Sequence, residues 1–121
     1  MENKNNVYLV NAFSAGMIVD ILNDGDVTVV FKKINDIEDV KMLLKSGFIS
    51  VVGHETTAKL LGRMLDVDVP VNRISVKLKK GDIVVIFQLN QRLPEGVVLD
   101  EELLKNIDFT FILGTVDNVV Q

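Results

Sequence analysis

The single histidine of this 121-residue sequence, His54, lies in the segment GHETTA at positions 53–58. The apolar spacing that follows it predicts a helix that begins near His54. Backbone N–H groups at a helix N-terminus favour an anion, so a histidine there can bind a phosphate and donate a proton to its leaving oxygen. The alternative is a surface or N-cap histidine with no catalytic role, and these residues alone favour that alternative. Thr56 and Thr57 share the turn, either as ordinary helix residues or as hydroxyl donors to the anion.

A second polar segment, FQLNQRLPEGVVL at 87–99, follows an apolar run that is typical of a buried strand. Its hydrogen-bonding side chains gather within eight positions, at Gln88, Asn90, Gln91, Arg92 and Glu95. The Pro-Glu-Gly sequence at 94–96 suits a type I turn. In a functional interpretation Arg92 clamps a phosphate, and Glu95 orients the reacting group or accepts a proton. The alternative is an Arg92–Glu95 ion pair on a surface turn, which adds little stability.

Three further polar residues stand near predicted strand ends. Asn11 and Ser14 lie in VNAFSAGM, where they either cradle a ligand or simply form a turn and cap a helix. Arg73 shares a face with Lys77 and Lys79, and that face is either merely solvated or brings Arg73 to a phosphate. For all three residues, the structural interpretation is the simpler one.

Composition excludes several kinds of chemistry. The sequence has no cysteine, which rules out disulfides, zinc thiolate sites and cysteine nucleophiles, and one histidine cannot build a histidine-rich metal site within one chain. The net charge of −4 argues against a basic face for duplex DNA or RNA, but leaves a small anionic ligand open. The sequence has no long apolar run, and its start, MENKNN, does not have the pattern of a signal peptide. We therefore expect a cytoplasmic protein without a membrane segment.

The order of the patterns predicts an α/β (α+β) class: a single domain, residues 1–121, with a mixed β-sheet of about five strands flanked by helices. Residues 1–6 and 117–121 are expected to be flexible ends. Strand-like segments lie at 7–12, 27–32, 48–52, 73–79, 82–88 and 109–116, and helical patterns at 36–46, about 54–65 and 100–106, with a short helix as one interpretation of 16–22. The continuous apolar run at 82–88 predicts a central strand covered on both faces. The alternation at 73–79 places Ile74, Val76 and Leu78 toward the core.

Four segments together resemble the small viral and prophage ring nucleases that act as anti-CRISPR proteins against type III systems. They are YLVNAFSAGM at 8–17, GHETTA at 53–58, VPVNRISVKL at 69–78 and FQLNQRLPEGVVL at 87–99. The resemblance extends from about Val7 to Phe111, and four motifs in the same order are far more specific than one. One position departs from the pattern, since Gly16 stands where viral members often carry a polar residue, commonly Asn.

The resemblance implies an activity. Such proteins cleave cyclic tetra-adenylate to linear di-adenylates that end in 2′,3′-cyclic phosphate, which shuts off the ancillary nucleases of type III CRISPR. They use no metal or other cofactor, and they act as homodimers with the ring bound across the interface, in the host cytoplasm when the protein is viral. His54 matches the family's catalytic histidine, and Arg92 and Glu95 match active-site residues. Asn11, Ser14, Arg73 and Gln88 match positions of the ligand pocket.

Three other functions remain open at this point. A protein that binds the cyclic oligonucleotide without cleaving it would not need a histidine acid. A host enzyme could use the same chemistry to reset its own defence. A structural protein that contacts another protein would leave the polar segment around Arg92 without a role.

Overall fold

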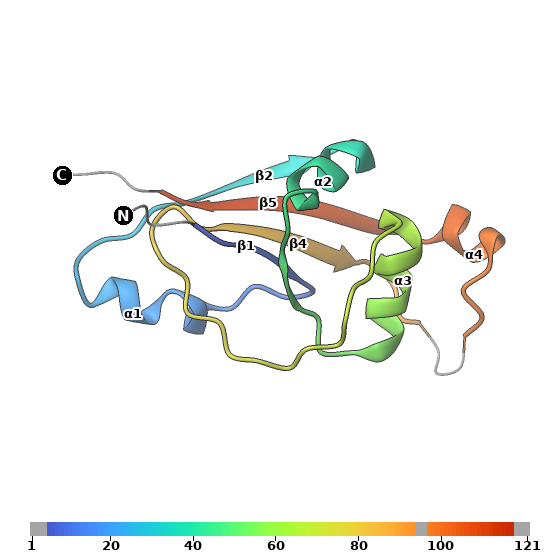
Figure 1. Cartoon of the computed structure of the whole chain (residues 1–121), viewed down its shortest axis with the longest axis horizontal. Helices are drawn as coiled ribbons and strands as arrows, with labels where there is room; N and C mark the ends of the chain where they lie inside the picture. The colour runs from blue at the N-terminus through green and yellow to red at the C-terminus, as the bar shows by residue number, and fades with distance from the viewer. Residues whose placement is uncertain (1–4, 94–96, 118–121) are drawn as a thin grey trace.

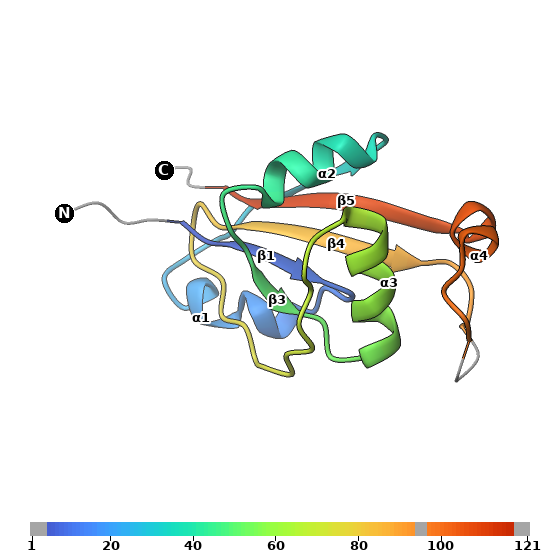
Figure 2. The same cartoon turned by 45° about the vertical axis from the view of Figure 1, so that its right-hand side comes forward.

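The apolar run in the last third of the chain forms the middle of the sheet. In the computed structural model, which describes residues 5–93 and 97–117, this run is strand β4, Ile83–Leu89. It pairs in parallel with β1 (Val7–Val10) and antiparallel with β5 (Phe109–Val116). At the edges, β3 (Ile49–Val51) lies beside β1 and β2 (Val29–Ile34) beside β5, in the order β2-β5-β4-β1-β3 (Figure 1 and Figure 2). The predicted single domain with a five-stranded mixed sheet and a central apolar strand is confirmed.

Helices cover both faces of this sheet (Figure 2). They are the 3₁₀ turn η1 (Ala15–Met17), α1 (Val19–Leu22), α2 (Ile37–Leu44), α3 (Glu55–Leu65) and α4 (Glu101–Asn106). On one face, α2 and α3 pack against Val85 and Phe87 of β4, and on the other, η1, α1 and Leu78 pack against Val84 and Ile86. Because side chains alternate along a strand, both faces of the apolar β4 are buried. None of these helices is long and apolar enough to cross a membrane.

The predicted strand at 73–79 is wrong. Residues 70–79 have no regular structure, although Val76 and Leu78 are buried as the alternation predicted. Ile74, which was predicted to face the core, is 46% exposed. The N–H of Asn72 donates to Val52, next to β3, and the N–H of Leu78 donates to Met17 in η1. Because these bonds go to different elements, no continuous ladder forms, and the segment runs along the molecule without regular structure. We refer to residues 70–79 as the strap.

Other boundaries differ by a few residues. The helix considered at 16–22 is split into η1 and α1 at Ile18, whose backbone is not helical (φ −115°, ψ 2°). Strand β2 begins at Val29 rather than at residue 27, and α2 ends at Leu44 rather than at residue 46. Residues 1–4 and 118–121 lie outside the described part of the chain. The described residues next to them are attached to the sheet, since the N–H of Asn6 donates to Asp82 and that of Asp117 to Thr28.

Candidate functional site

A cavity of about 680 Å³ opens at one end of the sheet, where three parallel strands end. The chain leaves β1 toward η1 and α1 on one face, and leaves β3 toward α3 on the other face. Ligands of open α/β sheets commonly bind outside the carboxyl ends of strands at such a point of divergence. The lining residues are Asn11, His54, Glu55, Thr56, Thr57, Phe87, Gln88, Leu89, Gln91, Arg92 and Leu93. Three separate parts of the sequence therefore meet here.

His54 is exposed to the cavity as the N-cap residue of α3, which begins at Glu55. Its carbonyl accepts the N–H of Ala58 at 2.9 Å, but its side chain makes no capping hydrogen bond. The N-caps of α2 and α4 are aspartates, and each carboxylate accepts a first-turn N–H at 2.9 Å. The first-turn N–H groups of α3 lack such an acceptor in the described structure. They leave a partial positive charge at the cavity wall beside an imidazole.

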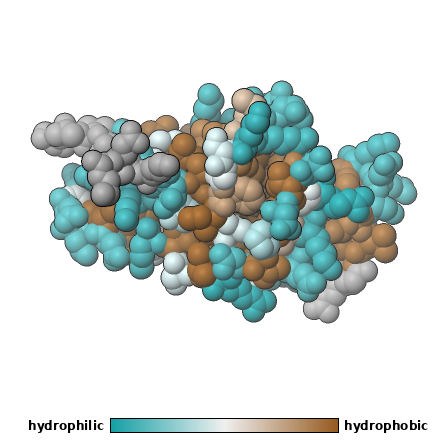
Figure 3. All heavy atoms as spheres, viewed as in Figure 1, coloured by the Kyte–Doolittle hydropathy of each residue, from teal (hydrophilic) through white to brown (hydrophobic). Residues whose placement is uncertain are grey.

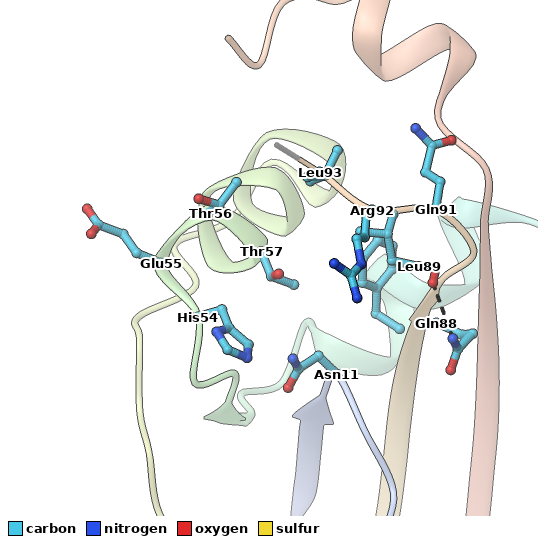
Figure 4. Close-up of a pocket in the computed structure, with 11 residues that line it drawn as sticks. Asn11, His54, Glu55, Thr56, Thr57, Gln88, Leu89, Gln91, Arg92 and Leu93 are labelled. Atoms are coloured by element: carbon cyan, nitrogen blue, oxygen red, sulfur yellow. Dashed lines mark hydrogen bonds between the residues drawn. The ribbon is translucent and has the colours of Figure 1, made fainter. Parts of the chain in front are cut away.

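The first turn of α3 presents a threonine hydroxyl to the same space. In Figure 4 the side chain of Thr57 lies between His54 and Arg92, whereas Glu55 and Thr56 point outward. Glu55 forms an exposed ion pair with Lys59 on the outer side of the helix, at 3.1 Å. The carboxylate nearest to His54 in sequence is therefore directed away from the imidazole and paired with Lys59.

Arg92 and Asn11 complete the polar wall. Arg92 follows the end of β4 and directs its guanidinium into the space opposite His54 (Figure 4). Asn11 follows the end of β1, and its amide lies beside the imidazole in the same view. A cation, an imidazole and an amide thus face one cavity, which is a suitable set of groups for a phosphate and its leaving oxygen.

The other polar residues after β4 have a different role. Asn90 donates to Asp108 and Thr110, at 3.2 Å each, and Gln91 accepts the N–H of Asp108 at 2.9 Å. These contacts fasten the end of β4 to the start of β5. Gln88 lines the cavity, but its amide donates to the carbonyl of Leu89 at 3.2 Å and lies apart from His54 (Figure 4). Of this polar cluster, Arg92 is the described residue that reaches toward the histidine.

Glu95 lies outside the described residues, as does the turn predicted at 94–96. Its predicted part in the site stays a prediction. The neighbouring Arg92 and Leu93 are described, and they bring the chain to the cavity wall immediately before that position.

Ser14 and Arg73 are placed away from this cavity. Ser14 is the exposed N-cap of η1 and lines a smaller cavity of about 230 Å³ between η1 and residues 74–77. The Nε of Arg73 donates to the carbonyl of Gly53 at 2.7 Å, and a Cβ at that glycine would lie 3.2 Å from Arg73 Cγ. Within one chain, Arg73 contacts the residue before His54 rather than the cavity.

Sequence reasoning did not identify the apolar part of the lining. Phe87, Leu89 and Leu93 line the cavity beside the polar residues. The rule that ligands bind beyond the carboxyl ends of parallel strands points to the end of β4, but it requires the pairing of β4 with β1, which no local pattern reveals. Among residues 5–93 and 97–117, no three His, Cys, Asp or Glu side chains come together as metal ligands would.

Comparison with known proteins finds similar sequences in viruses and in a bacterium. It is 44% identical over 79 residues to uncharacterized protein 26 of Sulfolobus islandicus filamentous virus, covering 64% of this chain and 67% of that protein. It is 35% identical over 99 residues to the uncharacterized protein ORF116 of Acidianus filamentous virus 1, covering 81% and 82%. The uncharacterized protein YddF of Bacillus subtilis is 30% identical over 82 residues, covering 65% and 76%.

A solved structure and a family model agree with these relatives. The structure of B116 of Sulfolobus turreted icosahedral virus (STIV) matches with a TM-score of 0.80 and 28% identity, covering 92% of this chain and 99% of that one. A family model described as STIV B116-like matches residues 7–111, which include every described part of the cavity. The chain therefore belongs to the STIV B116-like family.

Proposed function

We propose that the protein is a metal-independent phosphodiesterase, a ring nuclease that cleaves cyclic tetra-adenylate to linear di-adenylates ending in 2′,3′-cyclic phosphate. In a host cell this reaction would shut off the ancillary nucleases of type III CRISPR, so the protein would act as an anti-CRISPR factor. The observation that carries the proposal is the convergence of His54, Arg92 and the uncapped N-terminus of α3 on one cavity. The motif resemblance supplies the identity of the substrate, and the viral relatives fit the biological setting.

The chemistry needs only groups of this kind. In RNA, the 2′-hydroxyl of one nucleotide attacks the adjacent phosphorus, and the 5′-oxygen leaves. The P–O bond to the 2′-oxygen forms as the bond to the 5′-oxygen breaks. The 2′-hydroxyl loses its proton to a base or to water, and protonated His54 gives the departing 5′-oxygen its proton. A well-placed general acid contributes about 10²–10⁴-fold to such a rate. Two cuts at opposite phosphates convert one ring into two di-adenylates.

The remaining groups would hold the phosphate. The guanidinium of Arg92 suits two non-bridging oxygens, and the first-turn N–H groups of α3 suit an anion directly. The hydroxyl of Thr57 and the amide of Asn11 add neutral donors on either side of the imidazole. Such fixed donors favour a reacting geometry, and positioning alone is worth several powers of ten. In this proposal Glu95 orients the 2′-hydroxyl or accepts its proton.

A homodimer is part of the proposal. A cavity of about 680 Å³ lies in the usual range for one drug-sized ligand. Cyclic tetra-adenylate contains four nucleotides and is larger than such a ligand, so two cavities would share one ring. A two-fold dimer would present two copies of His54 to opposite phosphates of a symmetric ring. Apolar side chains are available for self-association, since Figure 3 shows hydrophobic residues at the surface in the middle of one face. Light scattering of the purified protein measures this oligomeric state.

The site itself is tested with a ring that cannot react. A 2′-deoxy ring lacks the internal nucleophile, so calorimetry with this ligand measures binding without turnover. We expect Arg92→Ala to weaken binding at least about tenfold, because it removes a charge-assisted phosphate contact. The matched control is Arg63→Ala, which removes an exposed arginine from the last turn of α3, outside this cavity. Equal effects of the two substitutions would contradict a phosphate site at Arg92.

A second function, sequestration of the ring without cleavage, uses the same cavity. It is favoured by one observation on residues 5–93 and 97–117. The carboxylate that lines the cavity, that of Glu55, points away from His54 and so is not placed to act as a base there. The two functions differ in products: chromatography after incubation with the ribose ring finds di-adenylates for a nuclease and intact rings for a sequestering protein. A host enzyme that resets its own defence would give the nuclease result, so genomic context rather than chemistry separates that case.

A further inference from the structure

The loop that carries His54 is held along its whole length by residues 70–73. Strand β3 is at the edge of the sheet, and an edge strand leaves alternate carbonyl and N–H groups open. Asn72 meets two of these groups at once. Its backbone N–H donates to the carbonyl of Val52, and its side-chain Nδ2 donates to the carbonyl of Ser50, each at 2.8 Å.

Further hydrogen bonds beside those of Asn72 hold the same loop. Ser50 is 4% exposed, and its hydroxyl donates to the carbonyl of Pro70 at 2.6 Å and accepts the N–H of Val52 at 3.3 Å. Arg73 Nε then donates to the carbonyl of Gly53, at 2.7 Å. The carbonyls of residues 50, 52 and 53 are therefore all bound by the strap, up to the peptide that joins Gly53 to His54.

We propose that Asn72 is a positioning residue for His54. It fixes the end of β3 and the peptide planes that follow, and so sets where the imidazole lies relative to Arg92 and the first-turn N–H groups of α3. Asn72 does not line the cavity, so it acts through Val52 and Gly53 rather than by touching a ligand. Its effect on turnover rests on the proposed nuclease function, whereas its effect on the imidazole does not.

This role differs from simple support of the fold in what it predicts for the histidine. Support alone would lower the free energy of unfolding and leave the folded site as it is. Positioning changes the surroundings of the imidazole in the folded protein. The chain contains one histidine, so the ¹⁵N and ¹H signals of its ring report on position 54 without ambiguity.

The experiment compares Asn72→Ala with wild type and with Asn6→Ala. The control removes a similar amide, which donates to the hydroxyl of Tyr8 at 3.2 Å at the opposite end of β1. We expect Asn72→Ala to shift the imidazole signals and to slow single-turnover cleavage at least about tenfold, since small displacements of a reacting group cost that much or more. Binding of the 2′-deoxy ring should change less than about threefold, because the phosphate contacts remain. Asn6→Ala should leave all three measurements as in wild type.

The outcomes separate the two proposals. Unchanged imidazole signals and an unchanged rate in a folded Asn72→Ala protein would overturn the positioning role. Shifted signals in a protein whose wild type does not cleave the ring would refute the nuclease and leave the positioning role standing. If Asn72→Ala does not fold, Asn72→Leu, which is similar in size but has no side-chain N–H to donate to the carbonyl of Ser50, takes its place with the same expected shift. Unchanged signals in that variant would also overturn the proposal.

Discussion

The N-cap of α3 allows a test in which stability and function move in opposite directions. His54 has backbone angles of φ −116° and ψ 129°, and Asp36 at the N-cap of α2 has φ −116° and ψ 122°. In this geometry Asp36 accepts the N–H of Glu38 at 2.9 Å, whereas the His54 side chain caps nothing. An aspartate at position 54 would therefore stand ready to accept the N–H of Thr56. We predict that His54→Asp makes the protein more stable.

The magnitude follows from two contributions. A good N-cap side chain is worth about 1 kcal/mol, and a negative charge beside the helix N-terminus adds about 0.3–1 kcal/mol. The expected gain in the free energy of unfolding is thus about 1–2 kcal/mol, or a rise in Tm of roughly 4–8 °C for a chain of this length. The same substitution removes the proposed acid and places a carboxylate where the phosphate would lie, so cleavage of the ring should be lost.

Urea unfolding at neutral pH measures the free energy by linear extrapolation. The reverse exchange, Asp36→His on α2, is the matched control, and it should cost about 1 kcal/mol because it removes a working cap. If His54→Asp is no more stable than wild type while Asp36→His is destabilised, the first turn of α3 is already satisfied. The idea that it is kept open for an anion would then be refuted.

Two buried side chains give further predictions. Asp82 is 1% exposed and accepts the N–H groups of Asn6 and Lys79, at 3.0 and 2.8 Å. Hydrogen bonds to a charged group are worth about 1.5–3 kcal/mol each, so Asp82→Ala should cost about 3–6 kcal/mol in urea unfolding. The exposed Asp68→Ala should cost less than about 0.5 kcal/mol, and equal losses would contradict a special role for the buried carboxylate. Phe87 is 1% exposed, packs against two phenylalanine rings of β5 and lines the cavity, so Phe87→Ala should cost about 3–5 kcal/mol and weaken binding of the 2′-deoxy ring. A calorimetric isotherm like that of wild type would contradict its contact with the ligand.

Local patterns predicted the parts of the fold that local physics determines. The start of α4 follows from Asp100, whose carboxylate accepts the N–H of Leu103, and the start of α3 at His54 follows from apolar spacing. The central position of β4 follows from its continuous apolar run, because side chains that alternate between the two faces are all apolar only where both faces are buried. In each case the hydrogen bond or the burial that decides the structure can be inferred from residues of the element itself.

The strap at 70–79 shows where such reasoning stops. Its alternation is real, since Val76 and Leu78 are buried, but a strand also needs a partner for its backbone. The bonds of Asn72 and Leu78 go to two elements that are distant in sequence, and no local pattern contains that information. The same limit applies to Arg73, whose residue type suits a phosphate but whose Nε is directed to the carbonyl of Gly53.

The candidate site was predictable in part for a related reason. His54, Thr57, Asn11 and Arg92 come from segments that end or begin elements, and sequence reasoning could mark each as a polar residue at a strand or helix end. That they share one cavity depends on the parallel pairing of β1 with β3 and β4, which brings the three ends together.

The most direct test is single-turnover cleavage of radiolabelled cyclic tetra-adenylate by wild type and His54→Ala, with EDTA present to remove metal ions. The proposed mechanism predicts conversion to di-adenylates ending in 2′,3′-cyclic phosphate by wild type, a rate at least about 10²-fold lower for His54→Ala, and no reaction of the 2′-deoxy ring. An intact ribose ring after incubation with wild type, or equal rates for the two proteins, would contradict it.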